Sequence, residues 1–152
     1  MSFFDGETTH PMDDKGRVSL PARHRKMLPD ELVLVPSYNE EFRSLSVFTE
    51  DAFEKWVDSL IEKMGGLSED SAESRHIERE LFSKVRRVTI DPAGRILIPS
   101  ELRQEACLGK TVKIVGVRRR IEIWNEELLK KSREAYSYAE IIKNDKKPQA
   151  LS

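Results

Sequence analysis

The chain has 152 residues, of which 38% are hydrophobic and 35% are charged, and its formal net charge is −1. This length favours one compact domain or two small interlocked ones, built around a modest apolar core. A single cysteine, Cys107, excludes a disulfide framework, and we expect it to fill a small apolar site in a reducing cytosol. Because no apolar run approaches the length of a membrane span and the first residues lack a signal-peptide pattern, we expect a cytoplasmic protein with no membrane partner.

One phrase of nine residues occurs twice. Residues 13–21 read Asp-Asp-Lys-Gly-Arg-Val-Ser-Leu-Pro, and residues 91–99, 78 positions later, read Asp-Pro-Ala-Gly-Arg-Ile-Leu-Ile-Pro. Aspartate favours the first position of a β-turn and glycine the fourth, so each phrase predicts a tight turn. Strand-like residues flank the second turn at 86–90 and 95–98, which predicts a hairpin there and a matching hairpin in the first copy.

The sequence after each phrase follows the same order in both copies. Pro21 and Pro99 suit the first turn of a short helix, and we expect Gly109 to end the second of these helices. Two apolar strand-like runs follow in each copy, at 32–35 and 45–48 and again at 112–115 and 121–124. Each copy therefore reads strand, turn, strand, short helix, strand, strand, helix, which indicates that one structural unit has been duplicated.

Three longer helices are predicted outside these β-rich units. Residues 50–64 carry a continuous apolar stripe, which consists of Phe53, Trp56, Val57, Leu60, Ile61 and Met64. A second helix reaches about residue 83, and a third covers 126–142. We divide the chain into a first repeat (1–49), a linking helical hairpin (50–83), a second repeat (84–125), a C-terminal helix (126–142) and a disordered tail (143–152).

Charge is distributed unevenly along the chain. Residues 83–120 contain ten basic and three acidic side chains, whereas residues 49–82 contain ten acidic and four basic ones. A basic β-rich unit beside an acidic helical one creates a local field that favours a nucleic-acid partner despite the small net charge. The alternative is that both segments are solvated faces of an oligomer.

In each phrase an aspartate and an arginine bracket the turn: Asp13 with Arg17, and Asp91 with Arg95. The carboxylate can fix the guanidinium across the turn. One interpretation is a salt bridge that only stabilises the fold. The other is that each aspartate orients its arginine toward a phosphate or a base edge, since a positioned arginine can bond guanine O6 and N7 together.

Two further basic clusters are candidate contacts. Arg23-His24-Arg25-Lys26 follows the first phrase and is either a nucleic-acid contact or a solvated helix face that pairs with a neighbouring subunit. Arg118, Arg119 and Arg120 lie between two strand-like runs, where they could contact phosphate or dock onto the acidic helices of a neighbour. Both interpretations remain open.

The sequence lacks the features of an enzyme. It contains no phosphate-cradling glycine loop and no nucleophile elbow, and its three histidines are scattered. We therefore expect no catalytic residues, no metal site and no cofactor.

Taken together, these features closely resemble the bacterial MraZ family of the AbrB-like swapped-hairpin superfamily. The resemblance rests on the two phrases, the helical hairpin between them and the closing Ile-Glu-Ile-Trp at 121–124, and it covers roughly residues 3–142. It implies an α+β fold in which two tandem AbrB-like swapped-hairpin β repeats form one intramolecular barrel, joined by a helical hairpin and followed by a C-terminal helix.

The resemblance also implies a function. MraZ proteins are transcriptional regulators that bind short direct repeats upstream of the division and cell-wall gene cluster, including their own promoter. They usually repress that cluster, associate with the nucleoid and assemble into homo-oligomeric rings. We therefore expect a sequence-specific regulator whose partner is double-stranded promoter DNA. The alternatives are an oligomeric protein-interaction scaffold, or the antitoxin role found elsewhere in the superfamily.

The resemblance also implies which residues bind DNA. Arg17 has the main role, and Arg95 occupies the matching position of the second copy. The cations expected beside Arg17 are Lys15, Arg23, Arg25 and Lys26. The residues expected to orient the motif are Asp13, Gly16, Asp91 and Gly94.

Overall fold

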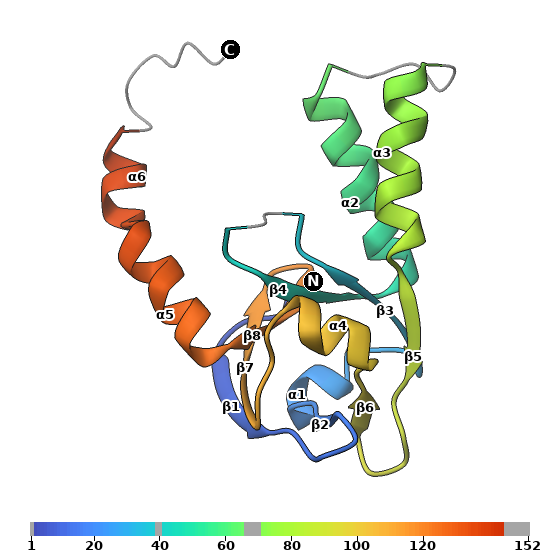
Figure 1. Cartoon of the computed structure of the whole chain (residues 1–152), viewed down its shortest axis with the longest axis vertical. Coiled ribbons are helices and arrows are strands. Elements are labelled where there is room, and N and C mark those ends of the chain that lie inside the picture. The colour runs from blue at the N-terminus through green and yellow to red at the C-terminus, as the bar shows by residue number, and fades with distance from the viewer. Residues whose placement is uncertain (1, 39–40, 66–70, 145–152) are drawn as a thin grey trace.

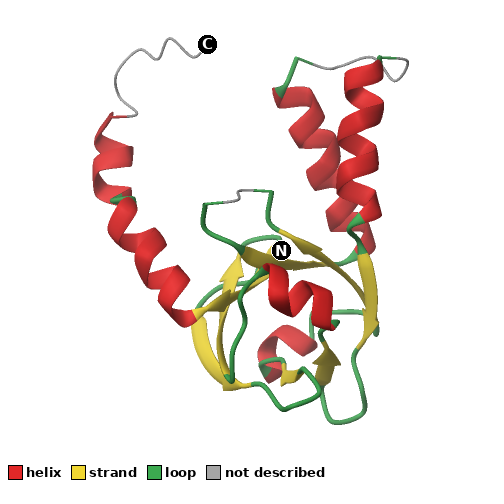
Figure 2. Ribbon diagram, in the orientation of Figure 1, coloured by secondary structure: helices red, strands yellow, loops and turns green. Residues whose placement is uncertain are grey.

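Both copies contribute strands to one antiparallel sheet of a mixed α+β structure (Figures 1 and 2). The computed structural model describes residues 2–38, 41–65 and 71–144. The strands are β1 (Glu7–Pro11), β2 (Arg17–Ser19), β3 (Glu31–Pro36), β4 (Ser44–Phe48), β5 (Arg86–Thr89), β6 (Arg95–Leu97), β7 (Thr111–Val117) and β8 (Arg120–Asn125). The helices are α1 (Ala22–Arg25), α2 (Glu50–Lys63), α3 (Ala72–Ser83), α4 (Ser100–Glu105), α5 (Glu126–Ala135) and α6 (Tyr138–Asn144).

The strand order shows that the copies exchange strands. Within the described ranges the larger sheet runs β1-β7-β8-β4-β3-β5, and β2 pairs with β6 in a separate two-stranded ribbon. The first strand of each copy thus pairs with the third strand of the other, while β4 and β8 meet at the centre. Strands β1, β3 and β4 of the first copy correspond to β5, β7 and β8 of the second. If each strand is exchanged for its counterpart, the strand order of the larger sheet is the same when read from the opposite edge, so the topology has an approximate two-fold symmetry.

The hairpin predicted around each phrase forms only close to its turn, where an isolated bridge joins Met12 to Val18 in the first copy, and it is wrong for the longer strands. The turns themselves form, because the Gly16 amide donates to the Asp13 carbonyl at 3.0 Å and the Gly94 amide to the Asp91 carbonyl at 2.9 Å. The strands on either side then separate: β5 pairs with β3, and β6 pairs with β2. A repeat this small cannot bury its own apolar face, so its strands complete a sheet with the other copy.

Apolar side chains from both copies fill a shared core. Val18 and Ile96 face inward from the ribbon and are fully buried, as are Leu34 and Ile114 from the larger sheet. Each such side chain contributes roughly 1.5–3 kcal/mol relative to an exposed one. The core therefore depends on both copies at once.

The linking helix α2 forms as predicted. Its N-cap is Thr49, whose hydroxyl accepts from the Ala52 amide at 3.1 Å, and it buries Phe53 and Val57 against Phe48 of β4. Figure 1 shows α2 and α3 on one arm and α5 and α6 on another, both projecting away from the end of the molecule that carries the turns before β2 and β6.

No helix among the described residues is long and apolar enough to cross a membrane.

The expected single helix over 126–142 is wrong. Helix α5 ends at Ala135, the backbone is extended at Tyr136, and α6 runs from Tyr138 to Asn144. Ser137 explains the break, since its hydroxyl accepts from the Glu140 amide at 3.3 Å and so caps a new helix. Of the tail expected to be disordered, residues 143–144 belong to α6, and 145–152 lie outside the described residues.

Cys107 does not fill an apolar site; it is exposed, with a φ of 56°. It is the left-handed residue that ends α4, where Gly109 was expected to end the helix. The Leu108 amide donates to the Arg103 carbonyl at 2.8 Å, and the Cys107 amide to the Gln104 carbonyl at 3.1 Å. These two bonds form a Schellman motif, which usually places glycine at this position.

Candidate nucleic-acid interface

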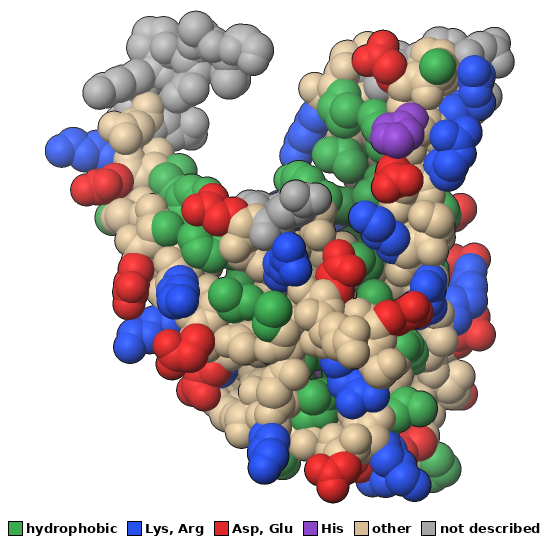
Figure 3. All heavy atoms as spheres, viewed as in Figure 1, with side chains coloured by type: hydrophobic (Ala, Val, Ile, Leu, Met, Phe, Trp, Pro, Cys, Tyr) green, Lys and Arg blue, Asp and Glu red, His purple; other side chains and the backbone are tan. Residues whose placement is uncertain are grey.

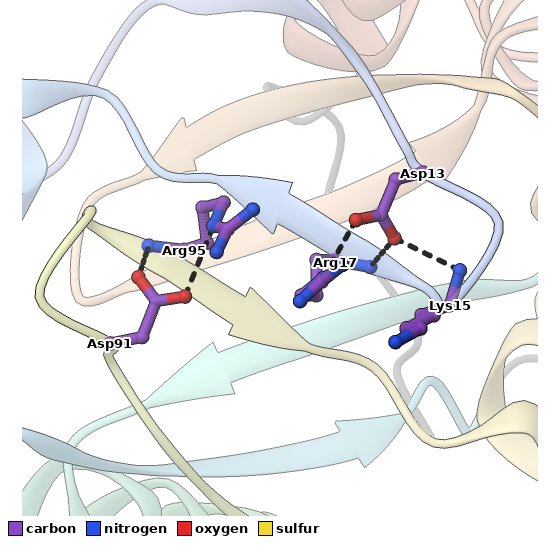
Figure 4. A network of polar contacts seen from close by, with 5 residues as sticks. All are labelled: Asp13, Lys15, Arg17, Asp91 and Arg95. Carbon is purple, nitrogen blue, oxygen red and sulfur yellow. Dashed lines mark hydrogen bonds and ion pairs between the residues drawn. The ribbon is translucent and has the colours of Figure 1, made fainter.

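Asp13 holds the first turn and its arginine with both carboxylate oxygens (Figure 4). Its Oδ1 accepts from the backbone amides of Lys15 at 3.0 Å and Arg17 at 2.8 Å. Its Oδ2 accepts from the Arg17 Nε at 2.7 Å. The carboxylate therefore fixes the turn backbone and the guanidinium together.

Asp91 repeats this arrangement in the second copy. Its Oδ1 accepts from the amides of Ala93 and Arg95, both at 2.9 Å, and its Oδ2 accepts from the Arg95 Nε at 3.0 Å. In both guanidinium groups only Nε is engaged within the described part of the chain. The two terminal amino groups remain as a fork, which is the geometry that a bidentate bond to guanine or phosphate requires.

The same bonds hold both aspartates in their charged form. The backbone amide of Arg17, with smaller contributions from its side chain and from Lys15, lowers the pKa of Asp13 to about 2 against the opposing effect of desolvation. The backbone amide of Arg95 likewise lowers the pKa of Asp91 below its usual value. Both arginines therefore face an ionised carboxylate throughout the physiological pH range.

The β2–β6 ribbon places the arginines on one surface. Arg17 lies opposite Leu97, and Ser19 lies opposite Arg95. Opposed residues of an antiparallel pair share a face, and the intervening Val18–Ile96 pair is buried, so these four side chains lie on the outer face. A two-stranded ribbon has the dimensions to enter the DNA major groove.

Each turn glycine is covered by an arginine from the other copy. A Cβ atom at Gly94 would collide with the guanidinium of Arg25, and one at Gly16 would lie 2.6 Å from the Arg103 Nε. Arg103 also donates through Nε to the Ile98 carbonyl at 3.0 Å. Arg25 was among the predicted contacts, whereas Arg103 was not. The two arginines match in the alignment of the two copies, and this match was a signal for Arg103.

The remaining predicted cations lie in different settings. Lys15 is exposed at the turn, and Lys26 is exposed at the end of α1. Arg23 forms an ion pair with the Asp5 carboxylate, so its charge is partly neutralised within the chain. His24 is only 3% exposed and packs edge-on against Phe4, so it belongs to the core rather than to a cationic surface.

Intrachain ion pairs reduce the predicted charge segregation. Arg87 pairs with Glu50 of α2 at 3.4 Å and with Glu31 at 3.1 Å, so part of the basic segment is neutralised by the acidic one. Arg120 pairs with Glu122 at 3.0 Å. Figure 3 accordingly shows basic and acidic side chains intermingled at the end opposite the two helical arms.

The arginine triplet adopts an unusual turn. Arg118 has a φ of 64°. Arg118 and Arg119 are exposed, whereas Arg120 is partly buried and forms an ion pair with Glu122. The described residues contain no cluster of three or more histidine, cysteine or acidic side chains that could hold a metal ion.

Comparison with known proteins gives one consistent result. The family model described as "MraZ protein, putative antitoxin-like" matches residues 3–77 and 81–147. A transcriptional regulator MraZ from Cytophaga hutchinsonii is 36% identical over 135 residues, covering 86% of this chain and 85% of its own length. Proteins with the same description from Coxiella burnetii (strain Dugway 5J108-111) and Roseiflexus castenholzii are 33% and 38% identical, covering 97% and 80% of this chain and 96% and 80% of their own lengths. The chain therefore belongs to the MraZ family, whose described members are transcriptional regulators rather than enzymes.

Proposed function

We propose that this chain is a sequence-specific DNA-binding transcriptional regulator whose β2–β6 ribbon contacts the DNA. The observation that carries the proposal is the repeated clamp, in which Asp13 and Asp91 engage the Nε of Arg17 and Arg95 and leave their terminal forks available. Lys15 in the first turn and Lys26 at the end of α1 supply phosphate contacts.

In this proposal the swapped strands form the barrel typical of the AbrB-like superfamily. The repeats at 1–49 and 84–125 provide the DNA-binding ribbon, and the segments at 50–83 and 126–142 provide assembly surfaces. Support for assembly comes from large apolar side chains that stay exposed on the helical arms: Met64, Phe82, Tyr138, Ile141 and Ile142. Copies of the chain pack through these arms into a ring, which presents several ribbons at once.

The target follows from family likeness. The protein represses the division and cell-wall gene cluster by binding direct repeats upstream of it, including its own promoter, and it associates with the nucleoid. Neighbouring repeats engage several ribbons of one ring, so weak single contacts combine through effective concentration.

A titration tests this proposal. Wild-type protein and Arg17→Ala are titrated into a duplex carrying the upstream region of the chain's own gene, at two salt concentrations. Wild-type binding should be specific and should weaken with salt, because phosphate contacts release counterions. Arg17→Ala should lose about tenfold or more in affinity, the cost of one bidentate base contact.

The matched control is Lys84→Ala, which removes an exposed cation between α3 and β5, outside the ribbon and outside the segments proposed for assembly. It should bind like the wild type. Absent binding, or equal binding to scrambled DNA, would reject the regulator in favour of the scaffold or antitoxin alternatives. Specific binding that is equal for Arg17→Ala and wild type would reject Arg17 as the contact. A large fall in the melting temperature of Arg17→Ala would support the salt bridge as a purely structural feature.

A further inference from the structure

Leu97 is an apolar side chain on an otherwise polar surface. It is 53% exposed on the outer face of the ribbon, directly opposite Arg17. It takes no part in the buried core, which the ribbon reaches through Val18 and Ile96. A half-exposed leucine between two arginines adds little to folding, so its contribution is better sought in what the ribbon binds.

Leu97 breaks the two-fold symmetry that relates the two strands of the ribbon. Exchange of the copies places Arg17 on Arg95, and Ser19 on Leu97. The arginine forks obey the symmetry, so they fit a DNA site equally well in either direction. Within the four outer positions of the ribbon, only the serine–leucine pair differs between the two directions.

The chemistry of these two side chains differs in the major groove. An apolar side chain there gains contact chiefly from the C5 methyl group of thymine, whereas a serine hydroxyl bonds to polar base edges of either kind. Lys15 and its counterpart Ala93 also differ, but a lysine that contacts phosphate carries no direct base information. The base-level asymmetry is therefore concentrated in Leu97.

We propose that Leu97 contacts a thymine methyl group and thereby sets the direction in which the ribbon lies on its DNA site. The inference rests on the proposed DNA-binding function. It explains how a nearly two-fold symmetric reader can recognise direct repeats, which all point the same way. A strictly symmetric ribbon would bind each repeat in both directions.

The first experiment removes thymine methyl groups one at a time. Deoxyuridine replaces each thymine of the upstream duplex in turn, and binding is measured for wild type, Leu97→Ala and Leu97→Ser. At one thymine of each repeat the substitution should weaken wild-type binding about fourfold, the effect of losing one buried methyl group. Both variants should be insensitive at that thymine and unchanged at the others.

The second experiment determines the direction in which the protein lies on each DNA repeat. Cys107 is the only cysteine and is exposed, so an iron chelate attached to it can cleave nearby DNA. Because Cys107 belongs to the second copy, wild type should cleave on one side of each repeat. The exchange variant Ser19→Leu with Leu97→Ser should move the cleavage to the other side.

The outcomes separate this inference from the function on which it rests. If wild type shows no specific binding, both fail. If it binds specifically but the deoxyuridine penalties are the same for Leu97→Ala, or if the exchange leaves cleavage in place, the inference alone is rejected. Both substitutions are at exposed positions, so unchanged circular dichroism is the expected control for folding.

Discussion

Arg103 of α4 lies against Gly16 of the other copy, with its Nε where a glycine Cβ would stand. Arg25 has the same relation to Gly94. Each turn that carries a forked arginine is thus completed by a helix from the other repeat. Strand exchange therefore has a local consequence at the candidate interface: each turn is packed against a side chain of the other repeat.

Gly16→Ala should destabilise the protein more than a glycine-to-alanine change at another left-handed position. Gly16 has a φ of 92°, which costs about 1–2 kcal/mol for a residue with a Cβ. That Cβ would also lie 2.8 Å from the Ile98 carbonyl oxygen, which belongs to the backbone and cannot swing aside. Chemical denaturation measures the loss in free energy of unfolding.

Gly65→Ala is the matched control. Gly65 has nearly the same φ, 93°, but a Cβ there meets no atom of the residues that the structure describes within 4 Å. It should cost only the backbone strain, so the difference between the two variants isolates the close approach of Arg103 and Ile98. Equal losses would mean that the turn relaxes to admit the methyl group.

Asp13→Asn should weaken DNA binding without preventing folding. The amide oxygen can still accept from the turn backbone, but its amino group cannot accept from the Arg17 Nε. The guanidinium then loses its fixed direction, and we expect a loss in affinity of about tenfold, comparable with the loss of one bidentate contact. Undiminished affinity would show that the fork does not need its carboxylate; Asp14→Asn, next in the chain, is the control for the change in charge.

The same variant should lose part of the pH dependence of stability. The pKa of Asp13 is lowered in the folded protein to about 2, from an ordinary value of 3.8. Its contribution is therefore complete above the unfolded pKa and is lost as the pH falls through the folded one. From about pH 4 to about pH 2 the melting temperature of wild type should fall more steeply than that of Asp13→Asn. Parallel curves would mean that the clamp does not form in solution.

Local chemistry made much of the fold predictable. The turn residues, the Thr49 cap and the apolar stripe of α2 act within a few positions along the chain, so their pattern predicted the observed structure. The Asp13–Arg17 and Asp91–Arg95 pairs were predictable for the same reason. The duplication also indicated that two related halves would pack together.

Strand pairing could not be predicted from the residues in the same way. Arg86–Thr89 could pair with β6 across its own turn or with β3 of the other copy, and the choice depends on which sheet buries more apolar surface. The settings of Arg23 and His24 also depend on tertiary structure, because Asp5 and Phe4 approach α1 from a distant part of the chain. A run of basic letters cannot show which of them will be paired or buried.

Cys107→Gly should stabilise the protein. Cys107 occupies the left-handed position of a Schellman motif, where glycine avoids the steric cost of a Cβ atom. Glycine also costs entropy, because it is more flexible in the unfolded chain. The net gain should be about 0.5–1 kcal/mol, which corresponds to a melting temperature higher by about 1–4 °C. The bond from the Asn125 Nδ2 to the residue 107 carbonyl, 2.7 Å long, is a backbone contact and should survive. The control is Cys107→Ala, which keeps the Cβ and removes only the thiol, so calorimetry should find no rise in its melting temperature. A rise in both variants would place the strain in the sulfur rather than in the backbone.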